Sequence, residues 1–364
     1  MDPVENDGAE TPPRSSRPTP DPDAASAASR RLDKALTIAA WSVGIALVVF
    51  GAYFGLRVYQ QNEAARLASP AFQVIDALQK QVKAKPDDAT LHSRLAEALG
   101  AASLFDEAKT ELAVAIKIDP KYVGAFENLA TIELLQKQYK SSAVHWQKVL
   151  DLTGSSDMQE VNQRREVAYF HLGEIALLQK DYVGAVGYFN AAIRIRKDAS
   201  DTYLRLGQAY AGLGQNDAAM EQIGIALTFD PRFPEAHFER GKIYLAKGDK
   251  ADAAWDFRAA LDGAPGNQEA QTAIDALGTF GSWYDTANSA TDLQTALQAV
   301  QVARAIRPDS YEAAMLNGTI LEKQGDEAGA VDAFAVALKV RPGDKAATAA
   351  LTRAKAASGK KGHK

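Results

Sequence analysis

The sequence contains no cysteine, and this absence excludes several kinds of site. Disulfides, thiolate metal ligands, haem attachment through C-x-x-C-H and cysteine nucleophiles all require that residue. A chain without free thiols suits an oxidising compartment, although the absence does not identify one.

Motifs that carry chemistry are missing as well. The five histidines show no H-E-x-x-H motif and no paired i, i+4 spacing, and neither a G-x-x-x-x-G-K-[ST] loop nor a G-x-S-x-G elbow occurs. Acidic pairs such as Asp106-Glu107 stand at expected helix starts, where the helix dipole favours negative charge. We therefore expect a protein that is not an enzyme and that has no catalytic residues, cofactor or metal.

Clustered positive charge is scarce. The chain has 41 Lys and Arg against 46 Asp and Glu, a formal net charge of −5. Its one basic cluster is the C-terminal end, with Lys360, Lys361 and Lys364, which we interpret as a solvated tail. A phosphate-binding face needs clustered Lys and Arg, so we expect no nucleic-acid partner.

Large apolar residues are almost absent from the first 30 positions, which are rich in Pro, Ser, Ala and Asp. Such a segment buries too little surface to offset its ordering entropy. We predict that residues 1–34 form a disordered cytoplasmic tail.

Residues 35–56 then run for 22 positions without a charge. As a helix this stretch is about 33 Å long, enough to cross a hydrocarbon core of about 30 Å. The 20 residues before it carry four basic residues and the 20 after it carry two, which places the N-terminus in the cytoplasm. We predict a single-pass protein of a bacterial inner membrane, with the rest of the chain in the periplasm or outside.

Within this predicted transmembrane helix, Gly51 and Gly55 have the small-xxx-small spacing that lets two helices approach closely. A homodimer through this face is one interpretation. The other is that glycine is common in membrane helices without any dimer.

Residues 57–87 are predicted to form a helical stalk and an N-terminal cap. Ser69-Pro70 has the pattern of a helix N-cap and first helical residue, and apolar residues follow at helical spacing. The pattern ends at Lys85-Pro86-Asp87-Asp88.

From there to residue 342, a small residue recurs at a regular interval. The steps between successive members are 34, 43, 34, 34, 43 and 34 residues, and the members are Ala108, Ser142, Ala185, Ala219, Ala253, Ala296 and Ala330. Two steps are therefore 34 plus nine. Further residues keep the same beat: from Ser200 they are Tyr203, Leu206, Gly207, Tyr210, Ala219, Ile223, Ala226 and Pro231.

This pattern resembles the tetratricopeptide repeat, which expects large residues at positions 4, 7, 11 and 24, small ones at 8, 20 and 27, and proline at 32. The resemblance implies an all-α fold: a right-handed α-solenoid over residues 88–342, with about seven helix–turn–helix repeats, followed by a capping helix and basic tail at 343–364. The small positions lie where two helices cross. His92 and His237 fall at position 4, so we assign them to packing rather than to metal binding.

Two segments depart from the period. The first nine-residue insertion lies within residues 152–165, where we expect a longer loop or helix end. For the second, we expect helix A at Gln268–Leu277, helix B at Asp292–Ile306 and a loop over 278–291. Phe280, Trp283 and Tyr284 on that loop either contact a partner or pack into the solenoid core.

Function is expected on the concave face, which the first helix of each repeat lines. The Lys and Asn or Arg pattern of carboxylate-clamp repeats is absent apart from Asn128. The predicted groove residues are Leu134, Phe170, Glu174, Leu177, Leu178, Leu204, Phe238, Leu245 and Met315, with an acidic fringe at Glu127, Asp201 and Glu235. Such a surface fits an amphipathic helix or an extended apolar segment.

The sequence therefore predicts a membrane scaffold that binds protein or peptide partners in envelope assembly, secretion or protein maturation. An auxiliary subunit of an envelope enzyme, for glycan or lipopolysaccharide assembly or cytochrome maturation, is the alternative. An import receptor of an organelle outer membrane is a third, and the charge bias counts against it.

Overall fold

The computed structural model describes residues 47–58, 61, 69–154 and 159–361, and every regular element in them is an α-helix. The predicted all-α class is thus confirmed for this part of the chain. The chain divides into two compact units, Met1–Lys80 and Gln81–Lys364, and each is described by itself.

In the first unit, residues 47–58 form a helix whose apolar side chains are exposed, among them Phe50 (65%) and Phe54 (60%). Residues 35–46 of the predicted span lie outside the described residues. Among the helices that the structure does describe, none combines the length and apolarity needed to cross a bilayer. A Cβ added to Gly51 or Gly55 would have no neighbour within 4 Å. Helix α2 (Pro70–Ala84) begins at the predicted proline.

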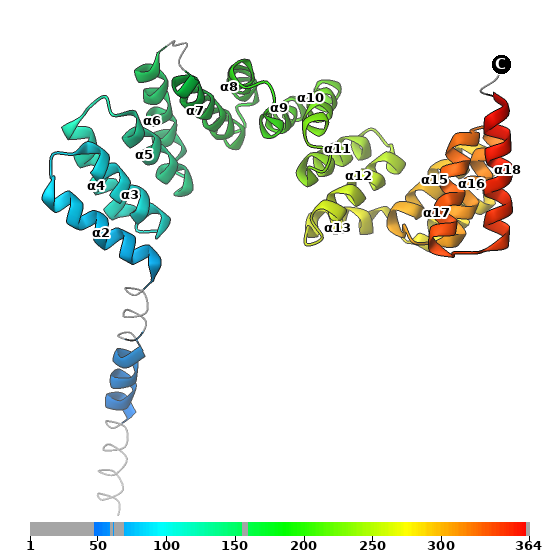
Figure 1. Cartoon of the computed structure of the whole chain (residues 1–364), viewed down its shortest axis with the longest axis horizontal. Helices are drawn as coiled ribbons and strands as arrows, with labels where there is room; N and C mark the ends of the chain where they lie inside the picture. Colours follow the sequence, from blue (N-terminus) through cyan, green and yellow to red (C-terminus); the bar gives the residue numbers. More distant parts are fainter. Residues whose placement is uncertain (1–46, 59–60, 62–68, 155–158, 362–364) are drawn as a thin grey trace, which may run out of the picture. The chain divides into compact units, whose positions relative to one another are not determined.

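The second unit is built from helices that pair as hairpins in chain order (Figure 1). The hairpins are α3 (Ala89–Ala101) with α4 (Phe105–Ile118), α5 (Val123–Leu135) with α6 (Tyr139–Thr153), α7 (Gln159–Leu178) with α8 (Tyr182–Ile195), α9 (Ser200–Gly212) with α10 (Asn216–Phe229), α11 (Pro234–Ala246) with α12 (Lys250–Gly263), α14 (Phe280–Ser289) with α15 (Leu293–Ile306), and α16 (Tyr311–Gln324) with α17 (Glu327–Val340). Helix α18 (Lys345–Lys361) packs on α17 and lies in the segment predicted as a C-terminal cap.

The repeated small residues lie at the helix crossings. The anchors from Ala108 to Ala330 are at most 4% exposed, and the large residue four positions later is also buried. A Cβ added to Gly173 would lie 2.6 Å from the ring of Phe189, and one added to Gly241 would lie 2.7 Å from Phe257. The glycine at position 8 therefore makes room for the aromatic residue at position 24.

The turn inside each regular hairpin needs a left-handed residue at position 15. The residues there are Ser103 (φ 60°), Lys137 (59°), Lys180 (62°), Gly214 (75°), Gly248 (85°) and Gly325 (79°). A side chain in this region costs roughly 1–2 kcal/mol relative to glycine. The first three hairpins accept that cost, whereas the later ones with this turn use glycine.

The first insertion extends a helix. Helix α7 has 20 residues, whereas the first helices of the neighbouring hairpins, α5 and α9, have 13. Residues 155–158 lie outside the described part. The added length lies at the N-terminal end of α7, as the expectation of a longer helix end allowed.

The second insertion differs from the prediction. Residues 280–289, expected in a loop, form helix α14, and α14 is the helix that pairs with α15. The expected helix A, Gln268–Leu277, forms as α13 but packs on α12. There its Ala270 and Ile274 join the core cluster of Phe257 and Leu261, in the place that a helix A would fill. The nine added residues are thus an extra helix, which explains why the sequence pattern pointed to the wrong partner for α15.

As a result, α12 also packs directly against α15, a contact between two second helices. Ala251 and Ala254 of α12 meet Val302 and Ala305 of α15 in one cluster. The aromatic residues of α14 are half-buried around these cores, and Trp283 Nε1 donates a hydrogen bond of 2.8 Å to the Leu277 carbonyl. Of the two interpretations of these aromatics, packing is the one that the contacts support.

Candidate functional site

A pocket of about 450 Å³ opens between the second and third hairpins. Its lining comes from three helices: Glu127 and Thr131 of α5, Trp146 of α6, and Gln163, Arg164, Val167 and His171 of α7. Polar and apolar side chains alternate around it, which is the composition of sites that orient a ligand while burying part of it.

The insertion in α7 supplies one side of this pocket. Gln163 and Arg164 belong to the turns that precede the regular start of the repeat at Glu166. Arg164 makes an ion pair with Glu127 across the pocket. The next residue, Arg165, donates hydrogen bonds to the Leu150 carbonyl (3.3 Å) and the Tyr169 hydroxyl (3.1 Å), and so holds the extension against α6.

The base of the pocket is a stacked pair of rings. Trp146 is 2% exposed, and the His171 imidazole lies on it with centroids 4.7 Å apart and planes 22° apart. Nδ1 of His171 lies 2.9 Å from Oε2 of Glu174, which fixes the imidazole orientation. The indole Nε1 of Trp146 is buried without a hydrogen-bond partner among the described residues.

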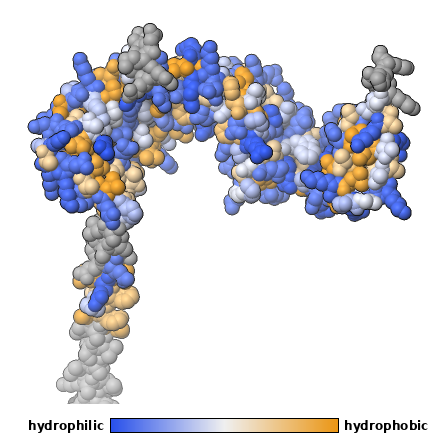
Figure 2. All heavy atoms as spheres, viewed as in Figure 1, coloured by the Kyte–Doolittle hydropathy of each residue, from blue (hydrophilic) through white to orange (hydrophobic). Residues whose placement is uncertain are grey.

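Polar contacts link the first helices of successive hairpins along this face. Asn128 donates to Ser93 Oγ (3.1 Å), Arg205 lies 3.8 Å from Glu174, and Gln208 donates to Glu239 (3.2 Å). The Glu127 and Glu174 carboxylates, predicted as part of an acidic fringe, therefore have cationic partners within the chain. This surface is more polar and closer to neutral than the sequence pattern indicated. Figure 2 agrees, because hydrophilic residues cover most of the face in view of Gln81–Lys364.

The structure separates the predicted groove residues into two kinds. Leu204 is 2% exposed because it packs in a core cluster with Ile223 and Ile243, so it is not available to a partner. The half-buried ones that pack against core clusters are Leu134, Phe170, Leu177, Phe238 and Met315. Leu178 (58%) and Leu245 (38%) are exposed at the helix ends.

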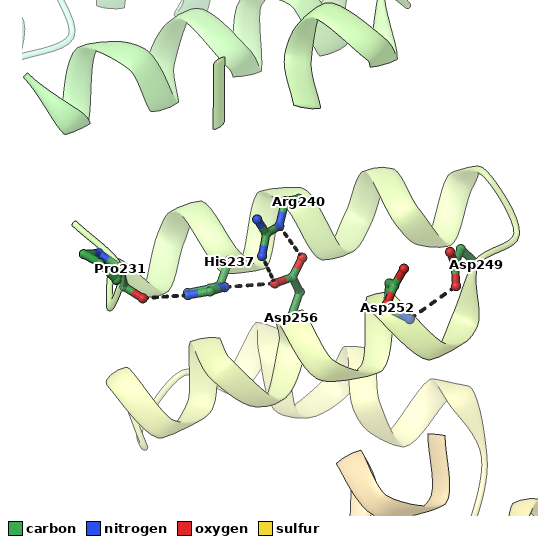
Figure 3. Close-up of polar contacts among 6 residues, drawn as sticks. All are labelled: Pro231, His237, Arg240, Asp249, Asp252 and Asp256. Carbon is green, nitrogen blue, oxygen red and sulfur yellow. Dashed lines mark hydrogen bonds and ion pairs between the residues drawn. The ribbon is translucent and has the colours of Figure 1, made fainter. Parts of the chain in front are cut away.

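His237 belongs to a polar cluster between α11 and α12 (Figure 3). Its Nδ1 lies 2.9 Å from Asp256 Oδ1 and its Nε2 lies 3.1 Å from the Pro231 carbonyl oxygen. Arg240 donates two hydrogen bonds of 2.7 Å to the same carboxylate, which is buried. The three side chains connect the two helices of the hairpin.

The same arrangement occurs in the first hairpin, without the arginine. His92 Nδ1 lies 2.6 Å from Glu111 Oε2, and its Nε2 lies 3.0 Å from the Pro86 carbonyl oxygen. In both hairpins the histidine is at position 4, the acid is at position 23 and the proline is three residues before the repeat. This explains both histidines by packing, and no group of three potential metal ligands occurs among the residues that the structure describes.

The electrostatics of the Asp256 cluster follow from burial and pairing. Burial alone would raise the pKa of Asp256, but hydrogen bonds from Arg240 and His237 hold this pKa below its ordinary value. The hydrogen bond to Asp256 raises the pKa of His237, with burial acting against it. The cluster therefore holds a charged carboxylate between two cations and stabilises the hairpin.

Sequence reasoning missed the pocket because its parts have unrelated signals. Trp146 stood at a packing position, and His171 was one of the unpaired histidines. Arg164 lay in an insertion without a predicted contact. The available signal was the insertion itself, since an extension of α7 toward α5 had to carry its basic residues close to Glu127.

Comparison with known proteins agrees with this architecture. A family model described as the tetratricopeptide repeat matches residues 163–201, 204–268 and 285–350. Over 141 residues, 38% of this chain, the sequence is 27% identical to the protein CTR9 homolog of Arabidopsis thaliana, of which the match covers 12%. The chain thus spans only a small part of that curated relative.

Among solved structures, the C-terminal part of a repeat protein from Cytophaga hutchinsonii aligns with a TM-score of 0.46 and 15% identity, over 77% of this chain and 94% of that one. YrrB, a repeat protein with an unusual peptide-binding site, aligns with a TM-score of 0.45 and 18% identity, over 55% of this chain and 99% of that one. The described part of this chain, with its successive hairpins and its matching family segments, is an all-α solenoid of tetratricopeptide repeats.

Proposed function

We propose that the chain is a non-catalytic scaffold that holds a polypeptide segment of a partner protein in the pocket between α5, α6 and α7. Repeats of this kind typically mediate contacts between proteins. The observation that carries the proposal is the stacked Trp146–His171 pair beneath the Glu127–Arg164 ion pair. The rings offer an apolar surface, and the charged pair offers a donor and an acceptor at its edge.

The pocket fits a side chain and its flanking peptide groups rather than a metabolite. It is open to solvent and lined by half-buried or exposed residues apart from Trp146. Such a surface binds weakly per residue, so the affinity would come from several contacts along the solenoid.

Site-specific photo-crosslinking tests this proposal. A photoreactive residue at Thr131 should crosslink a defined protein in native membranes, and His171→Ala or Arg164→Ala should abolish the product. The matched control is Arg341→Ala, which removes another arginine–carboxylate ion pair, that with Glu312, in the last hairpin. If Arg341→Ala removes the product as well, or if Thr131 yields none, the pocket is not the binding site.

We also propose that residues 35–56 anchor the scaffold in a membrane, with the N-terminus in the cytoplasm and the repeats on the other side, where the chain takes part in envelope assembly, secretion or protein maturation. The charge-free run of 22 residues, the four-to-two basic bias and the exposed apolar side chains of residues 47–58 support this setting.

The orientation has a direct test because the chain has no native cysteine. A single cysteine replacing Gly359 would react with a membrane-impermeant maleimide in intact spheroplasts. Shielding of that cysteine until the cells are lysed would contradict the proposed orientation. Recovery of the chain in the soluble fraction would contradict the anchor.

A further inference from the structure

The turns of the second and third hairpins expose a group of apolar side chains on one edge of the solenoid. Leu135 ends α5 and is 64% exposed, Leu178 ends α7 and is 58% exposed, and Val183 in the first turn of α8 is 71% exposed. Large apolar residues exposed next to one another mark interaction sites more often than scattered ones do.

This exposure is particular to two hairpins of the same chain. Leu135 and Leu178 both occupy position 13 of the repeat. The residues at position 13 of the other regular hairpins are Ala101, Gly212, Ala246 and Lys323. The fold does not need leucine there, because these hairpins form the same turn with small or charged residues.

Lysines accompany the two leucines, and their backbones are strained. Lys137 (φ 59°) and Lys180 (φ 62°) follow the leucines by two residues and occupy the left-handed position that is glycine in later hairpins. Strained residues that persist where an unstrained alternative exists point to function. Lys140, in the first turn of α6, adds a third exposed cation.

The acidic groups close to these lysines are already engaged. The Asp181 side chain accepts a hydrogen bond from the Gly184 amide and caps α8, and Glu133 is buried against His145. No ion pair joins Lys137, Lys140 or Lys180 to an acid within the described residues. The edge thus combines apolar surface with positive charge that the described chain leaves unbalanced.

We propose that this edge, the leucine–lysine rim of Leu135, Lys137, Lys140, Leu178, Lys180 and Val183, docks an acidic amphipathic helix of a partner protein. Equivalent residues of stacked hairpins are separated by about one helix-packing distance, roughly 10 Å. On an α-helix, residues seven apart are separated by about 10.5 Å. A helix lying along the rim can therefore place two apolar residues on Leu135 and Leu178 and its acidic flanks near the lysines.

The rim shares no residue with the pocket proposed above, so the two surfaces can be tested separately. The probe is a fluorescein-labelled helical peptide with leucines seven residues apart and glutamates on both flanks. Its binding to the full-length chain is followed by fluorescence anisotropy, and the Tm of each variant is measured in parallel.

The strain makes the variants discriminating. The double variant Lys137→Gly, Lys180→Gly removes the charge and relieves the backbone, so it should raise the Tm while weakening peptide binding by about tenfold or more. Leu135→Ser, Leu178→Ser should weaken binding to a similar extent. Ser103→Gly is the matched control, because it relieves the same left-handed strain outside the rim. It should raise the Tm and leave binding unchanged.

Several outcomes would overturn the proposal. The peptide could fail to bind the wild-type chain, or bind the double glycine variant equally well. A lysine-flanked version of the peptide could bind as tightly as the acidic one. Finally, vesicles of phosphatidylglycerol could bind the wild-type chain and displace the peptide, which would assign the rim to a membrane surface instead.

Discussion

Gly318 lies so close to Phe334 that a Cβ atom on the glycine would stand 2.4 Å from Cε1 of the ring. Phe334 is fully buried and cannot turn aside within the α16–α17 hairpin. The pair repeats the position 8 to position 24 contact of the earlier hairpins, so its disruption measures what that contact contributes.

We predict that Gly318→Ala destabilises the protein by about 1–3 kcal/mol through overpacking, although alanine is the better helix former. Chemical denaturation followed by circular dichroism measures the change. Gly224→Ala is the control, since it lies in α10 with open space around its Cβ position and should be neutral or stabilising. Equal effects of the two variants would contradict the packing explanation.

Asp256→Asn should cost roughly 3 kcal/mol, because it leaves Arg240 and His237 without their shared buried carboxylate. Urea unfolding of the variant and the wild type measures the loss. Glu312→Gln removes the carboxylate of an exposed ion pair with Arg341 and should leave the unfolding midpoint unchanged. A midpoint for Asp256→Asn that equals the wild-type value would show that the cluster does not hold the hairpin together.

The stabilising effect of His237 should depend on pH in one direction. Because Asp256 raises the pKa of His237 in the folded protein, protonation favours folding. The contribution is complete below the ordinary histidine pKa and is lost as the pH rises through the raised pKa. We expect His237→Gln to lose more stability at about pH 5 than at about pH 9.

Comparing the two proteins at each pH isolates His237, because the His92–Glu111 pair is present in both. The free energies of unfolding come from urea titrations at the two pH values. A deficit of His237→Gln that is larger at the higher pH would contradict the sign derived from the Asp256 contact.

Arg304 presents the opposite case to Asp256. Its guanidinium lies 5.4 Å from the Trp255 ring centroid, its Nε is buried without a hydrogen bond, and burial lowers its pKa. The cost of the unsatisfied donor should exceed the cation–π gain, so Arg304→Met should stabilise the protein by about 1 kcal/mol. Thermal unfolding tests this, with Arg304→Lys as the charge-retaining control. A lower Tm for Arg304→Met would show that the stacked cation is stabilising.

The repeat was readable from sequence because its helix crossings demand small residues at fixed intervals. Ala108 and Ala330 are over 200 residues apart in the chain, yet both are fully buried for the same steric reason. Helix ends followed too, since α10 and α12 each end two residues before a proline, Pro231 and Pro265.

The second insertion was misread because local pattern does not distinguish between two acceptors for one apolar face. Helix α13 has the period of a helix A and covers α12 as such a helix would. Only the three-dimensional pairing of α14 with α15 shows that α13 is additional. The pocket was missed for a related reason, because the Arg164–Glu127 contact joins residues 37 positions apart and has no sequence period.

The direct contact between α12 and α15 has a consequence for how the solenoid responds to stress. In a repeat array, the coupling that passes from one unit to the next depends on a recurring interface. Here the fifth and sixth hairpins meet through two second helices and the small side chains of Ala254 and Ala305, with α13 standing where the regular neighbour would be. Cooperativity along the array is therefore set separately at this joint, and loss of the last hairpins need not propagate into the repeats that form the pocket.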